Sequence, residues 1–360
     1  MNENPVLGVF FHWLGGLAAG SFYVPYRGVK GWAWETYWLA GGFFSWIIAP
    51  WVLALLLVPE PTAILRQATG QCLFWTYFFG VLWGIGGLTF GLSVRYLGMS
   101  LGYAIALGFC SAFGALIPPI FAGTLGQIAS TRDGAVVLAS IPVCLAGIAV
   151  SALAGMSKEK ELTEEQKKST VQEFSFFKGV AVAAFAGIMS ACMSYGFVAG
   201  QPIAEATKAQ LLQHGRTDLW QGLPVLIVVL LGGFTTNFAW CVFLNLKNKT
   251  GGQYLGGAAD PAAEPAPRMR NYLLCALAGT AWYMQFFFFS MGKTRMGRYD
   301  YASWTLHMAS IIIFSTLWGI ALREWKGASR RTRVLIALGL GVLILSTLIA
   351  GYGYYLKPKE

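Results

Sequence analysis

The chain has 360 residues, of which 56% are hydrophobic and only 12% carry a charge. Soluble globular domains carry about 25% charged residues, so this composition excludes a soluble enzyme and indicates a protein that lies in a lipid bilayer. The net charge of +10 does not imply a nucleic-acid partner, because basic loops beside an anionic membrane leaflet account for it.

Ten uncharged apolar stretches, each long enough to cross a bilayer, follow one another along the chain. No basic segment precedes the first stretch and it contains no small-residue cleavage site, so we expect no signal peptide to be removed. The fourth stretch contains Pro118 and Pro119, which predict a kink or an end of its helix. The stretches cover residues 6–26, 37–58, 72–94, 99–123, 135–155, 179–200, 219–246, 272–292, 301–322 and 334–356.

The longest charged break runs from Met156 to Lys178 and leaves five stretches on each side. Two related halves with five crossings each must enter the bilayer from opposite sides, and a binding site is expected between them. We therefore predict an all-α membrane protein with ten transmembrane helices in a 5+5 inverted repeat. Its parts are a first five-helix half at 1–156, a charged connecting loop at 157–178 and a second five-helix half at 179–360.

A faint internal similarity supports two related halves. The paired positions are Trp83 with Trp282, Gly91 with Gly292, and Arg95 with Arg295. They lie at the junction of the third and fourth stretches and at the junction of the eighth and ninth.

The positions of Lys and Arg predict the orientation in the membrane. An even number of crossings puts both termini on one side, and most of the 26 Lys and Arg residues lie in loops on the other side. Because cytoplasmic loops are enriched in these residues, we expect both termini to lie outside the cytoplasm.

The cysteines and the short motifs point away from metal binding and enzyme chemistry. The sequence has no Cys-x-x-Cys, no His-Glu-x-x-His, no Gly-x-Ser-x-Gly and no phosphate-binding Gly-x-x-x-x-Gly-Lys. We therefore expect no enzyme, no ATP-driven pump, no metal and no cofactor. The six cysteines lie one per apolar stretch, as packing residues would: Cys72, Cys110, Cys144, Cys192, Cys241 and Cys275.

The stretch from Tyr299 to His307 places ionisable groups at the mouth and inside of the ninth apolar stretch. Asp300, Trp304 and His307 are spaced i, i+4 and i+7, so on a helix they share one face, with Ser303 beside them. A charge in hydrocarbon costs at least about 2.5 to 3.5 kcal/mol. These side chains are therefore expected to face water, a partner or a substrate.

Several long, tryptophan-containing blocks carry a resemblance that spans most of the chain. They are His12, Phe22-Tyr23-Val24-Pro25, Trp32-Ala33-Trp34-Glu35-Thr36, Ser45 to Trp51, Trp83-Gly84-Ile85-Gly86, Arg95 to Ser100, Trp282 to Phe288, and Tyr299 to Met308. In these blocks the sequence resembles the L-rhamnose-proton symporter family of the drug/metabolite transporter superfamily. The resemblance implies ten helices, a 5+5 inverted arrangement, and uptake of L-rhamnose or a related 6-deoxy sugar with protons across the bacterial inner membrane.

One departure concerns the substrate. After Gly86 the family usually has an Asn-rich segment, whereas this chain continues Gly87-Leu88-Thr89-Phe90. The change removes amide groups that could contact a sugar, so the resemblance leaves open which deoxy sugar is carried.

A sugar site needs hydrogen-bonding groups beside aromatic rings, because a hexose presents hydroxyl groups and an apolar C–H face. Trp304 offers a stacking face, with Asp300 and His307 on the same side of the helix. Gln285 places an amide in an aromatic run, where contact with lipid would be costly. The expected substrate-binding residues are His12, Tyr23, Trp83, Asn237, Trp282, Gln285, Tyr299, Ser303, Trp304 and His307.

Each candidate also has a structural interpretation. An intramembrane His can hydrogen-bond a neighbouring helix, and Gln285 and Asn237 can do the same. The tryptophans near the ends of the stretches, Trp34, Trp46 and Trp51, are more typical of an interfacial belt than of a substrate site. Ser190 and Ser194 are more typical of packing positions.

Proton coupling needs a group that changes its protonation as its surroundings change. Asp300 is the first choice among the few acidic residues near the apolar stretches, Glu35 is the second, and His307 is a possible partner. An apolar surrounding disfavours a charged carboxylate, so alternating exposure of one carboxyl group can load and unload a proton. The membrane potential supplies about 2.3 kcal/mol per charge per 100 mV, worth roughly 50-fold in sugar ratio.

Two other classes of function remain open. The superfamily also contains exporters of drugs and metabolites, so another small polar solute, the outward direction, or another coupling cation would fit the same fold. A membrane-embedded enzyme is more distant, because no catalytic motif is present. The expected partners are accordingly a small-molecule sugar, protons and the lipid bilayer.

Overall fold

The computed structural model describes residues 4–161, 176–256, 266–323 and 325–356. Within these residues every regular element is a helix, and nine helical segments are long and apolar enough to cross a membrane. One further apolar helix, Ile105–Phe121, is shorter. The predicted all-helical membrane protein is therefore confirmed.

The helices follow the predicted stretches closely. The first half contains α1 (Pro5–Ser21), α2 (Tyr23–Tyr26), α3 (Trp34–Gly42), η1 (Phe43–Ile48), α4 (Ala49–Leu57), α5 (Pro61–Gln67), α6 (Gly70–Phe121), α7 (Leu125–Ser130) and α8 (Arg132–Lys160). The second half contains α10 (Phe176–Ala199), α11 (Gln201–Gln213), η2 (Asp218–Trp220), α12 (Leu223–Asn248), η3 (Gly251–Leu255), α13 (Arg268–Arg295), η4 (Gly297–Ala302), α14 (Ser303–Ala321) and α15 (Arg330–Tyr355). The predicted connecting loop starts inside α8, which runs on to Lys160, and residues 162–175 of that loop lie outside the described residues.

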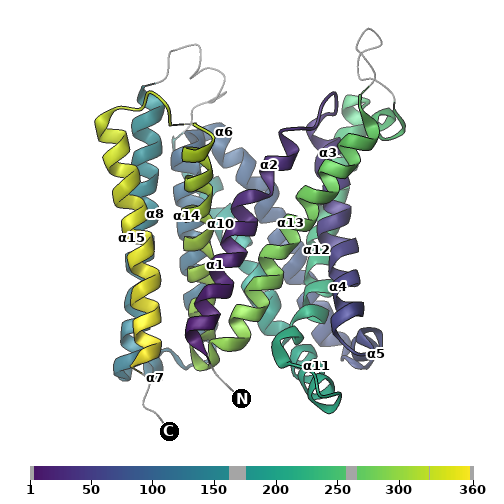
Figure 1. Cartoon of the computed structure of the whole chain (residues 1–360), viewed down its shortest axis with the longest axis vertical. Coiled ribbons are helices and arrows are strands. Elements are labelled where there is room, and N and C mark those ends of the chain that lie inside the picture. Colours follow the sequence, from purple (N-terminus) through teal and green to yellow (C-terminus); the bar gives the residue numbers. More distant parts are fainter. Residues whose placement is uncertain (1–3, 162–175, 257–265, 324, 357–360) are drawn as a thin grey trace.

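Both chain ends lie at the same end of the molecule. Figure 1 shows the start of α1 and the end of α15 side by side there. We call this the termini end, and the other the far end. An even number of crossings predicts this placement.

The second membrane-crossing segment is helical from Trp34 to Leu57, but its middle turn, η1, is π-helical. Pro50 gives a physical reason, because proline has no N–H and its ring clashes with the carbonyl four residues earlier, that of Trp46. Trp46 is only 3% exposed, so it lies inside the protein and the interfacial position favoured by the sequence is wrong for this residue.

The helix α6 carries two of the predicted stretches and reverses direction between them. A Cβ atom built on Gly102 would lie 3.2 Å from the carbonyl carbon of Ser93. In a straight helix, residues nine apart are separated by about 13.5 Å along the axis. The chain therefore folds back between these residues, and α6 has two arms. The second arm ends at Phe121, two residues after the predicted break at Pro118 and Pro119.

The helix α10 packs against both arms of α6. Along the first arm the contacts run in opposite directions, from Gly196 beside Thr76 to Gly179 beside Leu97. Along the second arm they run in the same direction, from Gly187 beside Phe109 to Ser194, whose hydroxyl donates to the Gly114 carbonyl at 2.7 Å. The two arms are therefore antiparallel.

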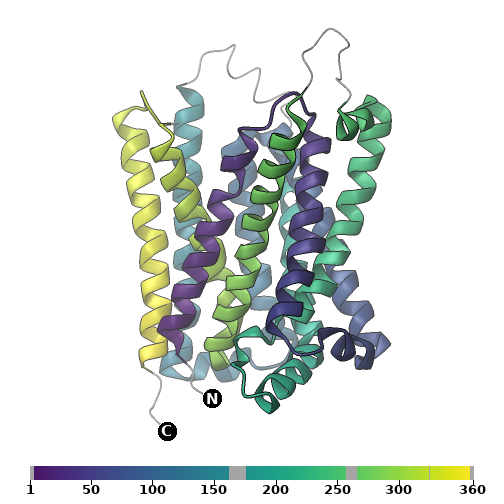
Figure 2. The ribbon, with the colours of Figure 1, turned by 45° about the vertical axis from the view of Figure 1, so that its right-hand side comes forward.

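The helix α1 likewise packs against two helices and lies between α13 and α14 (Figures 1 and 2). A Cβ atom on Gly15 would lie 2.8 Å from the Gln285 carbonyl oxygen of α13. A Cβ atom on Gly16 would lie 2.6 Å from the Ser310 carbonyl carbon of α14. Only glycine permits this approach of backbones, which is how membrane helices gain packing energy.

Enlarging Gly16 should destabilise the protein. We expect Gly16→Ala to lower the unfolding temperature in detergent, because overpacking against a backbone costs about 1 to 3 kcal/mol. Gly341→Ala on α15 is the matched control, since a Cβ atom there meets nothing within 4 Å. Equal unfolding temperatures for the two variants would contradict the close α1–α14 contact.

Candidate functional site

Two adjacent cavities open the protein at its termini end. One, of about 210 Å³, lies between α10, α11 and η2 on one side and the end of α13 on the other. The second, of about 220 Å³, lies between the second arm of α6, α10, α13 and the start of α14. Phe197, Lys293 and Asp300 line both cavities. We call the two cavities together the vestibule.

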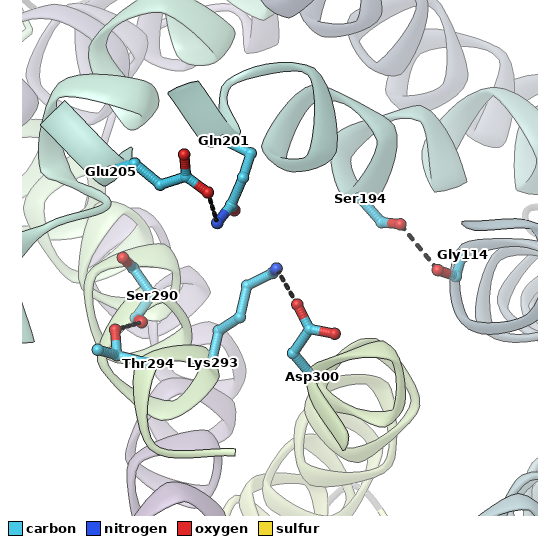
Figure 3. A network of polar contacts seen from close by, with 8 residues as sticks. All are labelled: Gly114, Ser194, Gln201, Glu205, Ser290, Lys293, Thr294 and Asp300. Carbon is cyan, nitrogen blue, oxygen red and sulfur yellow. Dashed lines mark hydrogen bonds and ion pairs between the residues drawn. The ribbon is translucent and has the colours of Figure 1, made fainter. Parts of the chain in front are cut away.

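The vestibule walls carry paired polar groups (Figure 3). Lys293 Nζ lies 2.6 Å from Asp300 Oδ2, and their side chains are 21% and 46% exposed. Figure 3 shows this pair facing Gln201 and Glu205, where the Gln201 amide donates to the Glu205 carboxylate at 3.2 Å. The vestibule is therefore polar and charged, in contrast to the surrounding apolar helices.

The start of α14 differs from its prediction. Asp300 lies in the 3-10 turn η4, and α14 begins only at Ser303. Asp300 therefore does not lie on a continuous α-helical face with Trp304 and His307, and it is partly exposed in the vestibule rather than buried in the bundle. The shared wall of the second cavity nevertheless brings Asp300 and Trp304 together.

At the inner end of the vestibule, aromatic rings meet two imidazoles. Trp304 lines the cavity and Phe289 lies beside it, with ring centroids 5.5 Å apart and nearly perpendicular planes. Behind them His307 lies 5.2 Å from Phe289, and His12 of α1 lies 6.5 Å from His307, both between ring centroids. Gly292 leaves room for His12, because a Cβ atom there would lie 2.8 Å from the imidazole Cε1.

Neither imidazole has a hydrogen-bond partner in the protein. Both nitrogens of His12 and both nitrogens of His307 are buried and unpaired, and the hydroxyl of Ser303 is too. A buried polar group without a partner costs about 1 to 3 kcal/mol, so native proteins rarely keep one without a reason. Three such residues at the inner end of a vestibule point to an external partner with hydroxyl groups or water.

A cluster of tryptophans closes the interior beyond the imidazoles. Trp83 and Trp282 lie 5.7 Å apart between ring centroids, and Trp46 lies 5.5 Å from Trp282. Gln285, 6% exposed, lies one turn along α13 from Trp282. A cavity of only about 10 Å³ remains between Trp46, Trp282 and Trp38.

The structure places four predicted site residues away from this centre. Glu35 lies at the far end, where Asn248 and Thr250 donate to its carboxylate at 3.0 and 2.8 Å. Asn237 accepts from the Trp38 indole at 3.1 Å and donates to the Gly233 carbonyl at 2.9 Å, which fits the interhelical alternative. Tyr23 is 49% exposed and stacks on Trp38, and Tyr299 donates to the Asp133 carboxylate of α8.

The sequence did not reveal three residues of the vestibule. Lys293 precedes Asp300 by seven residues near the end of an apolar helix, and this spacing does not predict that the two side chains form an ion pair. Phe289 belongs to a run of four phenylalanines in which periodicity does not distinguish one ring from the next. Gln201 lies on α11, which comes to line the same cavity as α13 only in the folded chain.

No metal centre accompanies these groups. Among the described residues, His, Cys, Asp and Glu side chains nowhere gather in the threes or more that a metal ion would need. The six cysteines are buried and unpaired as disulfides.

Comparisons with known proteins identify the family. The sequence pattern of the L-rhamnose-proton symport protein family matches residues 1–355. A protein of Cronobacter sakazakii named L-rhamnose-proton symporter is 36% identical over 354 residues, which are 98% of this chain and 99% of the relative. Proteins with the same name from Salmonella gallinarum and Salmonella paratyphi B are 37% identical over the same shares. The chain is therefore a multi-pass membrane transporter, not an enzyme, and belongs to the L-rhamnose-proton symport family.

Proposed function

We propose that this protein imports L-rhamnose or a related 6-deoxy sugar together with protons by alternating access. The observation that carries the proposal is the pair of buried, unpaired imidazoles behind Trp304 at the inner end of the vestibule. A sugar hydroxyl both donates and accepts, so it satisfies either tautomer of an imidazole. The ring of Trp304 offers the flat apolar surface that the C–H face of a sugar needs.

The sugar is held between the two halves of the protein. In the proposed complex His12 and His307 bind hydroxyl groups, while Ser303 and Gln285 add a hydroxyl and an amide. Trp304 forms one wall, and Trp83 and Trp282 form the inner limit. Asn237, Tyr23 and Tyr299 support this centre through the contacts described above and do not touch the sugar in the state seen here.

Alternating access follows from ten transmembrane helices in a 5+5 inverted repeat, and equivalent contacts in the two halves support this arrangement. Gly80 and Trp83 on α6 have the same three-residue spacing as Gly279 and Trp282 on α13. Gly80 packs against the backbone of α12, and Gly279 packs in the same way against that of α3. The two tryptophans contact each other, as equivalent residues beside a pseudo-twofold axis would.

The state seen here is open at the termini end. At the far end, Asn271 bonds both the amide and the carbonyl of Lys30, at 3.2 and 2.7 Å. Gln253 accepts from the backbone of Ala33 and from the Thr36 hydroxyl, both at 2.8 Å. These bonds and the tryptophan cluster must separate when the site opens to the other side.

Asp300 carries the coupled proton in this proposal. Its carboxyl group is open to the vestibule now and would be enclosed when the termini end closes, which disfavours the charged form. His307, in the buried wall behind Trp304, is the next titratable group inward. Glu35 sits at the far end with its hydrogen bonds already made, and we assign it to holding that end together.

The bias of Lys and Arg toward the far end supports an orientation with both termini outside the cytoplasm. With this orientation the vestibule faces outward in the bacterial inner membrane, as import requires. An exporter of another polar solute, or coupling to another cation, is the alternative that the same fold allows.

Replacing Asp300 separates binding from coupling. We expect Asp300→Asn to abolish uphill accumulation of L-rhamnose in proteoliposomes with an imposed pH gradient, while exchange of labelled for unlabelled sugar continues, because an amide cannot load a proton. Full accumulation with an unchanged pH dependence would remove Asp300 from the coupling mechanism.

Replacing His307 tests the sugar site. His307→Met keeps the volume and removes the unpaired nitrogens, so we expect unfolding temperature to hold or rise while L-rhamnose affinity falls by about tenfold or more. Asn271→Leu is the contrasting variant, because it breaks two existing hydrogen bonds and should cost about 1 to 3 kcal/mol of stability. Titration calorimetry and thermal unfolding in detergent measure both quantities. Destabilisation of His307→Met with unaltered sugar affinity would mark this histidine as a packing residue.

A further inference from the structure

Two ion pairs form at the last turn of α13, and they differ in kind. Arg295 lies 2.8 Å from Asp218 of η2, and both side chains are 13% exposed. Lys293 lies 2.6 Å from Asp300 of η4, and this carboxylate is 46% exposed. Both pairs line the first cavity, but only the second pair also lines the cavity that leads to Trp304.

The chemistry of the two cations matches this difference. Arginine is always charged, and its planar group holds a carboxylate in a fixed geometry, which suits a permanent tie between α13 and η2. Lysine is a point charge on a flexible stem and can leave its partner without breaking a planar double contact. Of the two ion pairs, Lys293–Asp300 is therefore the one whose side chains can separate more easily.

Other charged groups surround the pair without replacing it. On α11, which faces the pair across the vestibule (Figure 3), Glu205 accepts from Gln201 of the same helix, and Lys208 lines the first cavity. On η2, Asp218 is held by Arg295, and on α8, Asp133 accepts from Tyr299. Inward, His307 and His12 follow. Among the described residues Lys293 is the cation in ion-pair contact with Asp300.

We propose that Lys293 is the internal counter-ion that competes with the proton for Asp300 and so sets the pH at which the transporter loads. In the step, Asp300 carboxylate paired to Lys293 ammonium takes one proton from the vestibule water and becomes a neutral acid, and Lys293 keeps its proton and separates. When the proton leaves, the ion pair forms again. The ammonium of Lys293 and the proton thus compete for the same carboxylate.

Lys293 is a positioning residue in this scheme, and the inference rests on the proposed role of Asp300. Its test compares Lys293→Met, Lys293→Arg and Asp300→Asn in proteoliposomes, with labelled L-rhamnose as the probe. Exchange and gradient-driven uptake are each measured across a series of pH values. Arg295→Met is the matched control, because it removes a cation from the same turn of α13 but leaves the Lys293–Asp300 pair intact.

We expect Lys293→Met to shift the pH of half-maximal uptake upward by about one unit or more, the size of shift that a neighbouring opposite charge produces. Accumulation at neutral pH should fall about tenfold while exchange persists. Lys293→Arg should keep the pH profile near that of the parent protein. Arg295→Met should lower the unfolding temperature without moving the pH profile.

The outcomes separate the two proposals. If Lys293→Met keeps the parent's pH profile and full accumulation while Asp300→Asn is uncoupled, Lys293 is not the counter-ion. The proposed role of Asp300 then still stands. A fully coupled Asp300→Asn would overturn both. If Lys293→Met does not fold, Lys293→Gln removes the same charge and keeps a polar side chain in the vestibule. The pH of half-maximal uptake must then rise in Lys293→Gln, and a parent-like profile would overturn the counter-ion.

Discussion

The inner end of the vestibule depends on one physical constraint: polar groups buried in a membrane protein need partners, and His12, His307 and Ser303 have none in the chain. Two other buried polar candidates do have partners in the chain, the amide of Asn237 and the carboxylate of Glu35. This difference is the basis of the proposal that the imidazoles receive an external molecule. A sugar is suited to it because its hydroxyl groups supply donors and acceptors together.

Glycine packing makes this arrangement possible. Gly15 and Gly16 let α1 approach α13 and α14, which brings His12 to within 6.5 Å of His307 between ring centroids. Gly292 provides the space for His12 itself. The helix α10 packs in a similar way against the two arms of α6. The close helix contacts thus set the geometry around the imidazoles.

The two ends of the molecule use different chemistry. At the far end, neutral hydrogen bonds form around Asn271 and Gln253, and the rings of Trp34 and Trp38 stack. The termini end holds its charges in the vestibule, where Lys293 and Asp300 remain partly exposed. Neutral bonds keep their strength when water is excluded, whereas an ion pair in a polar vestibule can exchange with solvent and protons. The proposed mechanism, in which the protein loads at the termini end, needs this asymmetry.

The sequence by itself determined the membrane class, the order of the helices, the placement of both termini at one end and the family, because apolar length and block order are properties of the chain. It also named His12, Trp304 and His307, since an ionisable or aromatic residue inside an apolar stretch stands out. Only the tertiary structure decided which of the polar candidates remain unpaired. Asn237 and Glu35 look as promising as His307 in the sequence, but their partners lie about 200 residues away along the chain. The ion pair of Lys293 with Asp300 was hidden for a related reason: the 3-10 turn η4 turns the chain back, and periodicity predicts a helix there instead.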